Sequence, residues 1–176
     1  MTDSISSKTD FMKVRDFQKA FNCPAPEVPT PLSDAQAMNR ASFSAEEGIE
    51  LLFATAMDRE KFKDMYKEFL TRLNKSYEKQ LKKEFPPTKL IGQVDALIDQ
   101  KYFAEGGLVE TGVIPDAIFN HVHEANMGKI WDDGKAHYDE YGKIIKPANW
   151  EKDYAPEPKI AEEITRQIEL GASRFN

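Results

Sequence analysis

Apolar residues recur at helical spacing along most of the chain. In residues 11–21 they are Phe11, Val14, Phe17 and Phe21, which share one side of a short amphipathic helix. The same periodicity predicts further helices over 34–57, 59–84, 88–111, 115–125 and 157–171. No stretch alternates apolar and polar residues in the way of a half-buried strand. The sequence therefore predicts an all-α fold, most simply packed as a helical bundle.

Prolines and glycines mark where these helices stop. Four prolines within residues 24–31 exclude a helix there and favour an extended strap. Ser33 or Asp34 can then cap the helix that follows, and the pair Pro86–Pro87 ends the later, charged helix. Residues 128–158 hold glycines, prolines and aromatics with little periodicity, so we expect a long ordered loop in this region.

Length and composition fit one globular domain. With 176 residues, the chain is expected to form a single domain over 1–176, with 1–10 flexible and 58–90 a helical insert. A chain of this length should bury roughly 70% of its unfolded surface without needing a disulfide or a metal. Its single cysteine, Cys23, excludes an internal disulfide and a four-cysteine zinc site.

The charge balance limits the kinds of partner that the protein could bind. Twenty-four basic against 30 acidic residues give a net charge of −6, which argues against general nucleic-acid binding. No run of 18 apolar residues is present, and the first residues lack the apolar core of a secretion signal. We therefore expect a cytoplasmic protein that does not associate with membranes.

Two predicted helices carry acids beside their apolar stripes. Glu46, Glu47 and Glu50 are three and four residues apart, and so are neighbours on one helix face. Asp95 and Asp99 share a face of the other helix in the same way. If the helices pack by their apolar sides, the two groups of acids could converge and would then need a cation. Oxygen ligands of this kind suit Mg²⁺, Mn²⁺ or Ca²⁺.

Two other interpretations account for the same acids. Solvated carboxylates on helix surfaces would give the same pattern. A di-iron carboxylate bundle is disfavoured because it needs glutamate followed three residues later by histidine, and none of the three histidines is so placed. His121 and His123, two residues apart, do not share a helix face and are a poor metal pair.

The region after residue 125 is rich in lysine. Asn126, Lys129, Lys135, Lys143 and Lys146 lie together there with glycines, and lysines on such a loop can neutralise phosphate as mobile point charges. A solvated basic loop is the plainer interpretation. The sequence has neither a Walker loop nor a Rossmann glycine fingerprint.

Four blocks in order resemble the all-α nucleoside triphosphate pyrophosphohydrolase superfamily, which includes MazG-like and phosphoribosyl-ATP pyrophosphohydrolase-like proteins. They are DFQKAF with its proline strap, RASFSAEEGIEL, DALIDQKYFAEGGLVETGV, and FNHVHEANMGKIWDDGK with YGKIIKPANW, over roughly residues 14–150. The resemblance implies an oligomeric α-helical bundle, dimeric or tetrameric. It also implies Mg²⁺-dependent cleavage of a nucleoside triphosphate into its monophosphate and pyrophosphate, with Mn²⁺ as a possible substitute.

The resemblance also implies roles for individual residues. Glu47 and Glu50 match the metal-binding Glu-x-x-Glu, and Glu46 matches an acid that helps to orient water. Asp99 or Asp95 matches the closing aspartate, and Tyr102 lies in the tyrosine-bearing segment that follows. Asn126 and Lys129 match a nucleotide-contacting Asn-Met-x-Lys, and we add Lys135 of the same loop as a substrate-binding residue.

The chain departs from the family pattern in two places. The second acidic motif of the family is Glu-x-x-Asp, yet Gly92 and Ala96 stand three residues before Asp95 and Asp99. In addition, an insert over about 58–90 separates the two acid helices and could serve a partner subunit. The missing glutamate supports an alternative function, a non-catalytic helical nucleotide-binding or assembly protein. Action on another phosphate anhydride, such as a phosphoribosyl nucleotide, is a third possibility.

Overall fold

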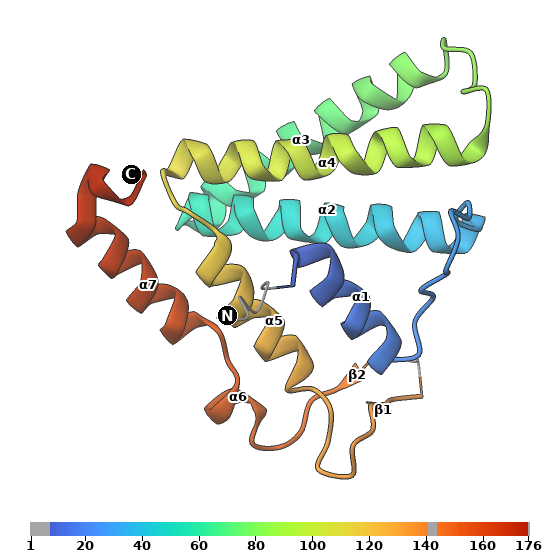
Figure 1. Ribbon diagram of the computed structural model, residues 1–176. Helices are drawn as coiled ribbons and strands as arrows, with labels where there is room; N and C mark the ends of the chain where they lie inside the picture. The colour runs from blue at the N-terminus through green and yellow to red at the C-terminus, as the bar shows by residue number, and fades with distance from the viewer. Residues whose placement is uncertain (1–7, 141–143, 176) are drawn as a thin grey trace. The chain divides into compact units, whose positions relative to one another are not determined.

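The computed structural model describes residues 8–140 and 144–175 (Figure 1). Its elements are α1 (Asp10–Ala20), α2 (Asp34–Ala56), α3 (Arg59–Gln80), α4 (Lys89–Thr111), α5 (Asp116–Met127), β1 (His137–Tyr138), β2 (Ile144–Ile145), α6 (Trp150–Asp153), α7 (Glu157–Leu170) and the 3₁₀ helix η1 (Gly171–Phe175). The structure is predominantly helical, which confirms the predicted all-α class. None of the helices in the described ranges is both long and apolar enough to cross a membrane.

Local capping explains why the central helices begin where the sequence predicts. The Ser33 hydroxyl accepts a hydrogen bond from the Gln36 backbone, and the Gln36 side chain accepts one from the Ser33 backbone, which together form a capping box for α2. The Asp58 carboxylate caps α3 by accepting from two backbone N–H groups of its first turn. Met57, at φ 54° in the left-handed region, ends α2 one residue earlier than predicted.

The predicted loop over 128–158 is more structured than expected. β1 and β2 form an antiparallel hairpin in which His137 pairs with Ile145 and Tyr138 with Ile144. The short helix α6 follows. The hairpin is held by tertiary contacts, since the Tyr138 hydroxyl donates to the carbonyl oxygen of Phe21 at 2.7 Å. Strands of two residues carry no periodicity that a sequence pattern could reveal.

The chain forms two compact units, and the prediction of a single domain over 1–176 stays a prediction. One unit is residues 28–99. Within it α2 packs along α3, where Phe53 and Phe62 meet edge to face with ring centroids 5.4 Å apart. The predicted insert over 58–90 is thus largely the helix α3, which ends at Gln80 rather than at residue 84.

The start of α4 is tied to the start of α2 inside this unit. The Gln93 side-chain amide donates to the carbonyl oxygen of Leu32 at 3.1 Å and accepts from the Leu32 backbone N–H at 2.8 Å. Lys89 forms an ion pair with Asp34 at 3.0 Å. Figure 1 shows that α2 and α4 run in the same direction from these anchors, while α3 runs back.

The other unit contains the described residues 8–27 and 100–175. Here α5 packs against α1 and α7, and the buried apolar residues are Phe21, Ala125 and Trp150. The Gln167 side chain secures α7 by exchanging two hydrogen bonds with the Ile114 backbone, both at 2.9 Å. This unit positions the end of α5 and the lysine-rich segment that follows.

Candidate active site

The predicted catalytic residue Glu46 and the four predicted metal ligands all lie on α2 and α4. We call Glu46, Glu47 and Glu50 the α2 glutamates, and Asp95 and Asp99 the α4 aspartates. All five side chains are exposed, and none forms a hydrogen bond or ion pair with another residue of the described ranges. Basic partners neutralise acids elsewhere on these helices, as Lys89 does for Asp34. The α2 glutamates and the α4 aspartates are therefore uncompensated negative charge.

A single chain does not gather these acids into a metal centre. Within residues 8–140 and 144–175, no three histidine, cysteine or acidic side chains lie close enough together to hold an ion. The donor set still fits the expected cofactor, because carboxylate oxygens without competing partners are what Mg²⁺ and Mn²⁺ prefer. The convergence of the two helices, and the roles given to their acids, stay predictions.

The structure explains why glutamate is absent from position 92. Gly92 lies in the first turn of α4 directly beneath Pro86, and a Cβ atom there would lie only 2.5 Å from Pro86 Cγ. Pro86 therefore occupies the space that any side chain at position 92 would need. Ala96, by contrast, is exposed. Asp95 and Asp99, four residues apart, are the acids that α4 carries where the family pattern has Glu-x-x-Asp.

The predicted nucleotide-contacting residues Asn126 and Lys129 meet at the C-terminal end of α5. Lys129 Nζ donates to Asn126 Oδ1 at 2.7 Å, and both side chains are partly buried. Beneath them lies Trp150, which is 6% exposed and donates from its indole nitrogen to the carbonyl oxygen of Ala125. The carbonyl end of a helix favours a cation, so α5 itself supports the Lys129 ammonium.

Lys146 joins Lys129 over the same tryptophan. The Lys146 ammonium lies 3.7 Å from the centre of the Trp150 ring, and that of Lys129 lies 5.9 Å from it. Burial lowers the pKa of Lys129, and repulsion by Lys146 lowers it further. Glu151 pairs with Lys146 at 3.1 Å from an exposed position. Two ammonium groups thus lie near one indole ring, an arrangement suited to holding an anion.

Trp150 is the site residue that sequence reasoning missed. In the sequence it is only an aromatic side chain near two lysines, without a spacing that marks it as a platform. Its role depends on the hairpin and α6, which return the chain from residue 130 to the end of α5. These are the elements that local periodicity does not predict.

The remaining predicted substrate residues lie apart from Trp150 or are exposed. Lys135 is exposed, and its charge helps to lower the pKa of Asp133, for which a hydrogen bond to His137 is the main cause. His137 also stacks on Trp131 with ring centroids 4.5 Å apart. Tyr102 on α4 is 75% exposed. Lys143 lies outside the described residues.

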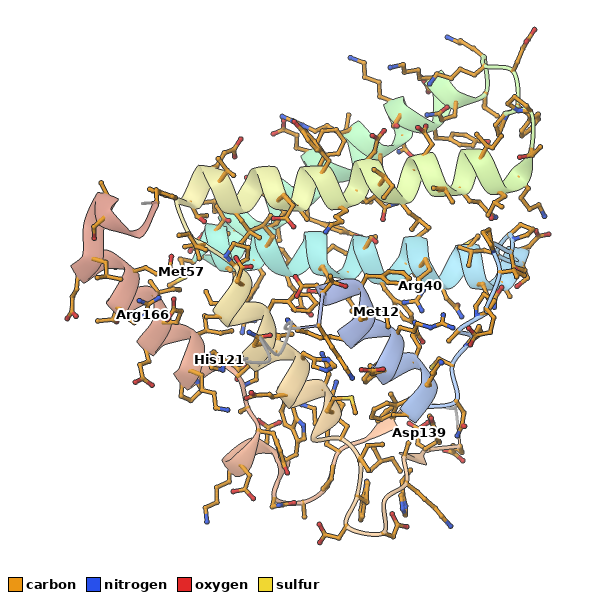
Figure 2. The ribbon with its side chains drawn as sticks, in the orientation of Figure 1. Met12, Arg40, Met57, His121, Asp139 and Arg166 are labelled. Atoms are coloured by element: carbon orange, nitrogen blue, oxygen red, sulfur yellow. The ribbon has the colours of Figure 1, made fainter. Side chains whose placement is uncertain are left out.

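A separate cavity of about 650 Å³ lies between α5 and α7. His121 and Arg166 line it from the two helices (Figure 2). Arg166 donates two hydrogen bonds to Glu163, and Gln167 donates a third. Together they lower the pKa of Glu163 to about 2. Both cations of this cavity are thus paired, Arg166 with Glu163 and Lys159 with Glu124, and we assign no substrate to it.

Comparison with known proteins agrees with the chemistry of the acid helices. Residues 14–126 match the family described as phosphoribosyl-ATP pyrophosphohydrolase, a range that includes the α2 glutamates, the α4 aspartates and Asn126. Lys129 and Lys146 lie beyond the matched range. None of the curated proteins is similar enough in sequence to count as a match.

A solved structure extends the similarity to nearly the whole chain. The crystal structure of a proposed NTP pyrophosphohydrolase from Exiguobacterium sp. 255-15 aligns with a TM-score of 0.84 and 32% sequence identity. The alignment covers 92% of this chain and 97% of that one. On these grounds, the chain belongs to the phosphoribosyl-ATP pyrophosphohydrolase family, within the all-α NTP pyrophosphohydrolase superfamily.

Proposed function

We propose that the protein is a Mg²⁺-dependent nucleoside triphosphate pyrophosphohydrolase that releases the monophosphate and pyrophosphate. The observation that carries the proposal is the set of five unpaired carboxylates on α2 and α4, in a chain that belongs to a pyrophosphohydrolase family. Glu46 and Glu50, four residues apart on one helix face, repel each other weakly without a cation, as do Asp95 and Asp99.

The mechanism divides between the two groups of residues. Glu47, Glu50 and the α4 aspartates would hold the metal, which would offset charge on the phosphates and make water a better nucleophile. Glu46 accepts the proton of the attacking water. Asn126 and Lys129 hold the nucleotide, and Lys146 joins Lys129 in neutralising phosphate oxygens from its place above Trp150.

We further propose that the protein acts as a homo-oligomer, a dimer or a tetramer, with a free nucleotide rather than a nucleic acid as its partner. Many apolar side chains on α2 and α4 are exposed in the single chain, including Leu51 at 68% and Ile98 at 59%. Exposed apolar area of this kind is a cost that a second subunit removes. The net charge of −6 fits a site that binds an anionic nucleotide with the help of a metal cation.

The test is release of pyrophosphate from a panel of nucleoside triphosphates with and without Mg²⁺. Glu50→Gln should reduce turnover at least about 100-fold, since losing a metal ligand should cost more than losing a residue that only supports one. Glu78→Gln, on an exposed acid of α3, is the matched control and should leave turnover unchanged. A Glu50→Gln variant with normal Mg²⁺-dependent activity would refute the assignment.

Two other functions are tested by the same panel. A non-catalytic nucleotide-binding or assembly protein would bind triphosphates without releasing pyrophosphate, and the missing glutamate of the second motif favours it. The family description favours a phosphoribosyl nucleotide as substrate, so phosphoribosyl-ATP belongs in the panel. If pyrophosphate is released from phosphoribosyl-ATP alone, that compound rather than a nucleoside triphosphate is the substrate.

A further inference from the structure

Lys129 differs from the other lysines in the part of the chain that is described. Only Lys13 and Lys129 are partly buried there, and the remaining lysines are exposed. Lys13 forms an ion pair with Asp10 at 2.9 Å. Lys129 has no carboxylate partner in the described ranges, and its Nζ donates instead to the neutral amide oxygen of Asn126 at 2.7 Å. It is therefore the one described lysine that is partly buried without an opposite charge beside it.

The backbone on both sides of Lys129 is held in place. Its N–H donates to the carbonyl oxygen of Asn126 at 3.2 Å, so that Asn126 binds both the main chain and the side chain of the lysine. Gly128, the residue before it, is buried against the ring of Tyr154, which occupies the space that a Cβ atom would need. The position of the Lys129 amine is thus defined by the fold, as it is not for a lysine on an exposed helix.

The surroundings of Lys129 favour its uncharged amine. Burial removes water from an ammonium group, and a second ammonium nearby repels it. Lys146 supplies the second charge, since the two nitrogens lie 5.9 Å and 3.7 Å from the centre of the Trp150 ring and hence no more than about 10 Å apart. The carbonyl end of α5 acts in the opposite direction. The pKa of Lys129 is nonetheless lowered, first by burial and then by Lys146.

These features together suit one class of reagent. A lysine that is desolvated and lies next to another cation is activated as a nucleophile. Lys146 is exposed while its ammonium lies over Trp150, so it can hold a phosphate group close to Lys129. An acyl phosphate offers both groups at once, a phosphate for Lys146 and a reactive carbonyl carbon for the Lys129 amine.

We propose that Lys129 is a site of acylation by acyl phosphates, with Lys146 holding the phosphate group during the reaction. The lone pair of the Lys129 amine attacks the acyl carbon, a C–N bond forms, and the C–O bond to the phosphate breaks. The phosphate leaves with the electron pair of that bond, and the proton of the nitrogen passes to water. The products are a neutral amide at Lys129 and inorganic phosphate.

Acylation would also regulate the enzyme, a consequence that rests on the proposed function. The amide removes the positive charge beside Asn126 and leaves only Lys146 over the Trp150 ring. After treatment with acetyl phosphate, KM for a nucleoside triphosphate should rise about tenfold, with a smaller change in kcat. Lys129→Arg keeps the charge but has no amine to acylate, so the same treatment should leave its KM unchanged.

Mass spectrometry that resolves each lysine tests the acylation without any activity. The full chain is incubated with acetyl phosphate, and the acetylation of each lysine is followed with time. Lys129 should react at least about tenfold faster than the exposed Lys152, because a cationic site raises the local concentration of an anion by that factor or more. Excess inorganic pyrophosphate should suppress the reaction at Lys129 but not at Lys152. Equal rates at the two lysines would overturn the proposal.

Two variants distinguish an activated amine from one that is merely accessible. Lys146→Ala removes the group that holds phosphate as well as the repulsion, so acetylation of Lys129 should slow about tenfold, whereas Lys152→Ala should leave it unchanged. Asn126→Asp places a carboxylate on the Lys129 amine with little change of shape. It should slow the reaction even with acetic anhydride, which is uncharged, because the carboxylate stabilises the ammonium. An unchanged rate in either Lys146→Ala or Asn126→Asp contradicts the proposal.

The acetylation and the pyrophosphate assay fail independently. If Lys129 is acetylated selectively in a protein that releases no pyrophosphate from any triphosphate, the modification site stands and the proposed function fails. If the wild-type protein releases pyrophosphate while Lys129 reacts no faster than Lys152, the proposed function stands and the modification site fails.

Discussion

Replacing Gly92 with alanine tests the structural reason for the missing glutamate. The added Cβ would lie 2.5 Å from Pro86 Cγ and 3.0 Å from Pro86 Cβ. Carbon atoms pack best at about 3.5–4.0 Å, so the proline would have to move by about 1 Å. Its ring cannot swing away as a flexible side chain does, because it closes on its own backbone. Overpacking of this kind costs about 1–3 kcal/mol.

Alanine in place of glycine also favours a helix, by about 1 kcal/mol, and this gain has to be separated from the overlap. Gly107 provides the control, since it lies in the same helix and a Cβ added to it would have nothing within 4 Å. Gly107→Ala should therefore stabilise the protein by up to about 1 kcal/mol. The difference between the two variants isolates the overlap with Pro86, which we expect to be about 2 kcal/mol.

The assay is urea unfolding at equilibrium, at one protein concentration because oligomers unfold in a concentration-dependent way. Gly92→Ala should unfold at lower urea than wild type, or at most equal it, while Gly107→Ala unfolds at higher urea. Equal gains in both variants would refute the reasoning, because Pro86 would then not be what excludes a side chain from position 92.

Three further predictions follow from the same geometry. Ala96→Glu places a glutamate three residues before Asp99 on an exposed surface, so the protein should unfold like wild type and need less Mg²⁺ for half-maximal activity. Lys146→Ala should raise KM about tenfold with a smaller effect on kcat, while the exposed Lys152→Ala should change neither. The pKa of Glu163 is lowered to about 2 by its hydrogen bonds from Arg166 and Gln167, below the ordinary value of 4.5, so its stabilisation is present above pH 4.5 and is lost as pH falls toward 2. The difference in Tm between wild type and Glu163→Gln should therefore shrink over that range in thermal scans.

The helices could be predicted because their signals are local. Ser33 caps α2 through groups three residues away, and Pro86–Pro87 separates α3 from α4 within the chain itself. The hairpin at His137 has no such signal. It exists because the Tyr138 hydroxyl reaches Phe21, a residue 117 positions earlier, and no window of sequence contains both.

The candidate site divides in the same way. Spacing alone identified the α2 glutamates and the α4 aspartates as pairs that share a helix face. Spacing could not establish where those faces lie relative to each other, because this depends on the direction in which the connecting segment returns the chain. For the same reason Lys146 could be assigned to a basic segment, but its position above Trp150 could not be predicted.

The insert decides that direction. A short turn after α2 would start α4 beside the end of α2 and make the two helices antiparallel. Instead, α3 carries the chain 22 residues back along α2 before α4 begins at Lys89. Within residues 28–99, α2 and the start of α4 therefore run parallel (Figure 1). An insert that adds none of the predicted site residues can therefore determine which stretches of the two acid helices lie side by side.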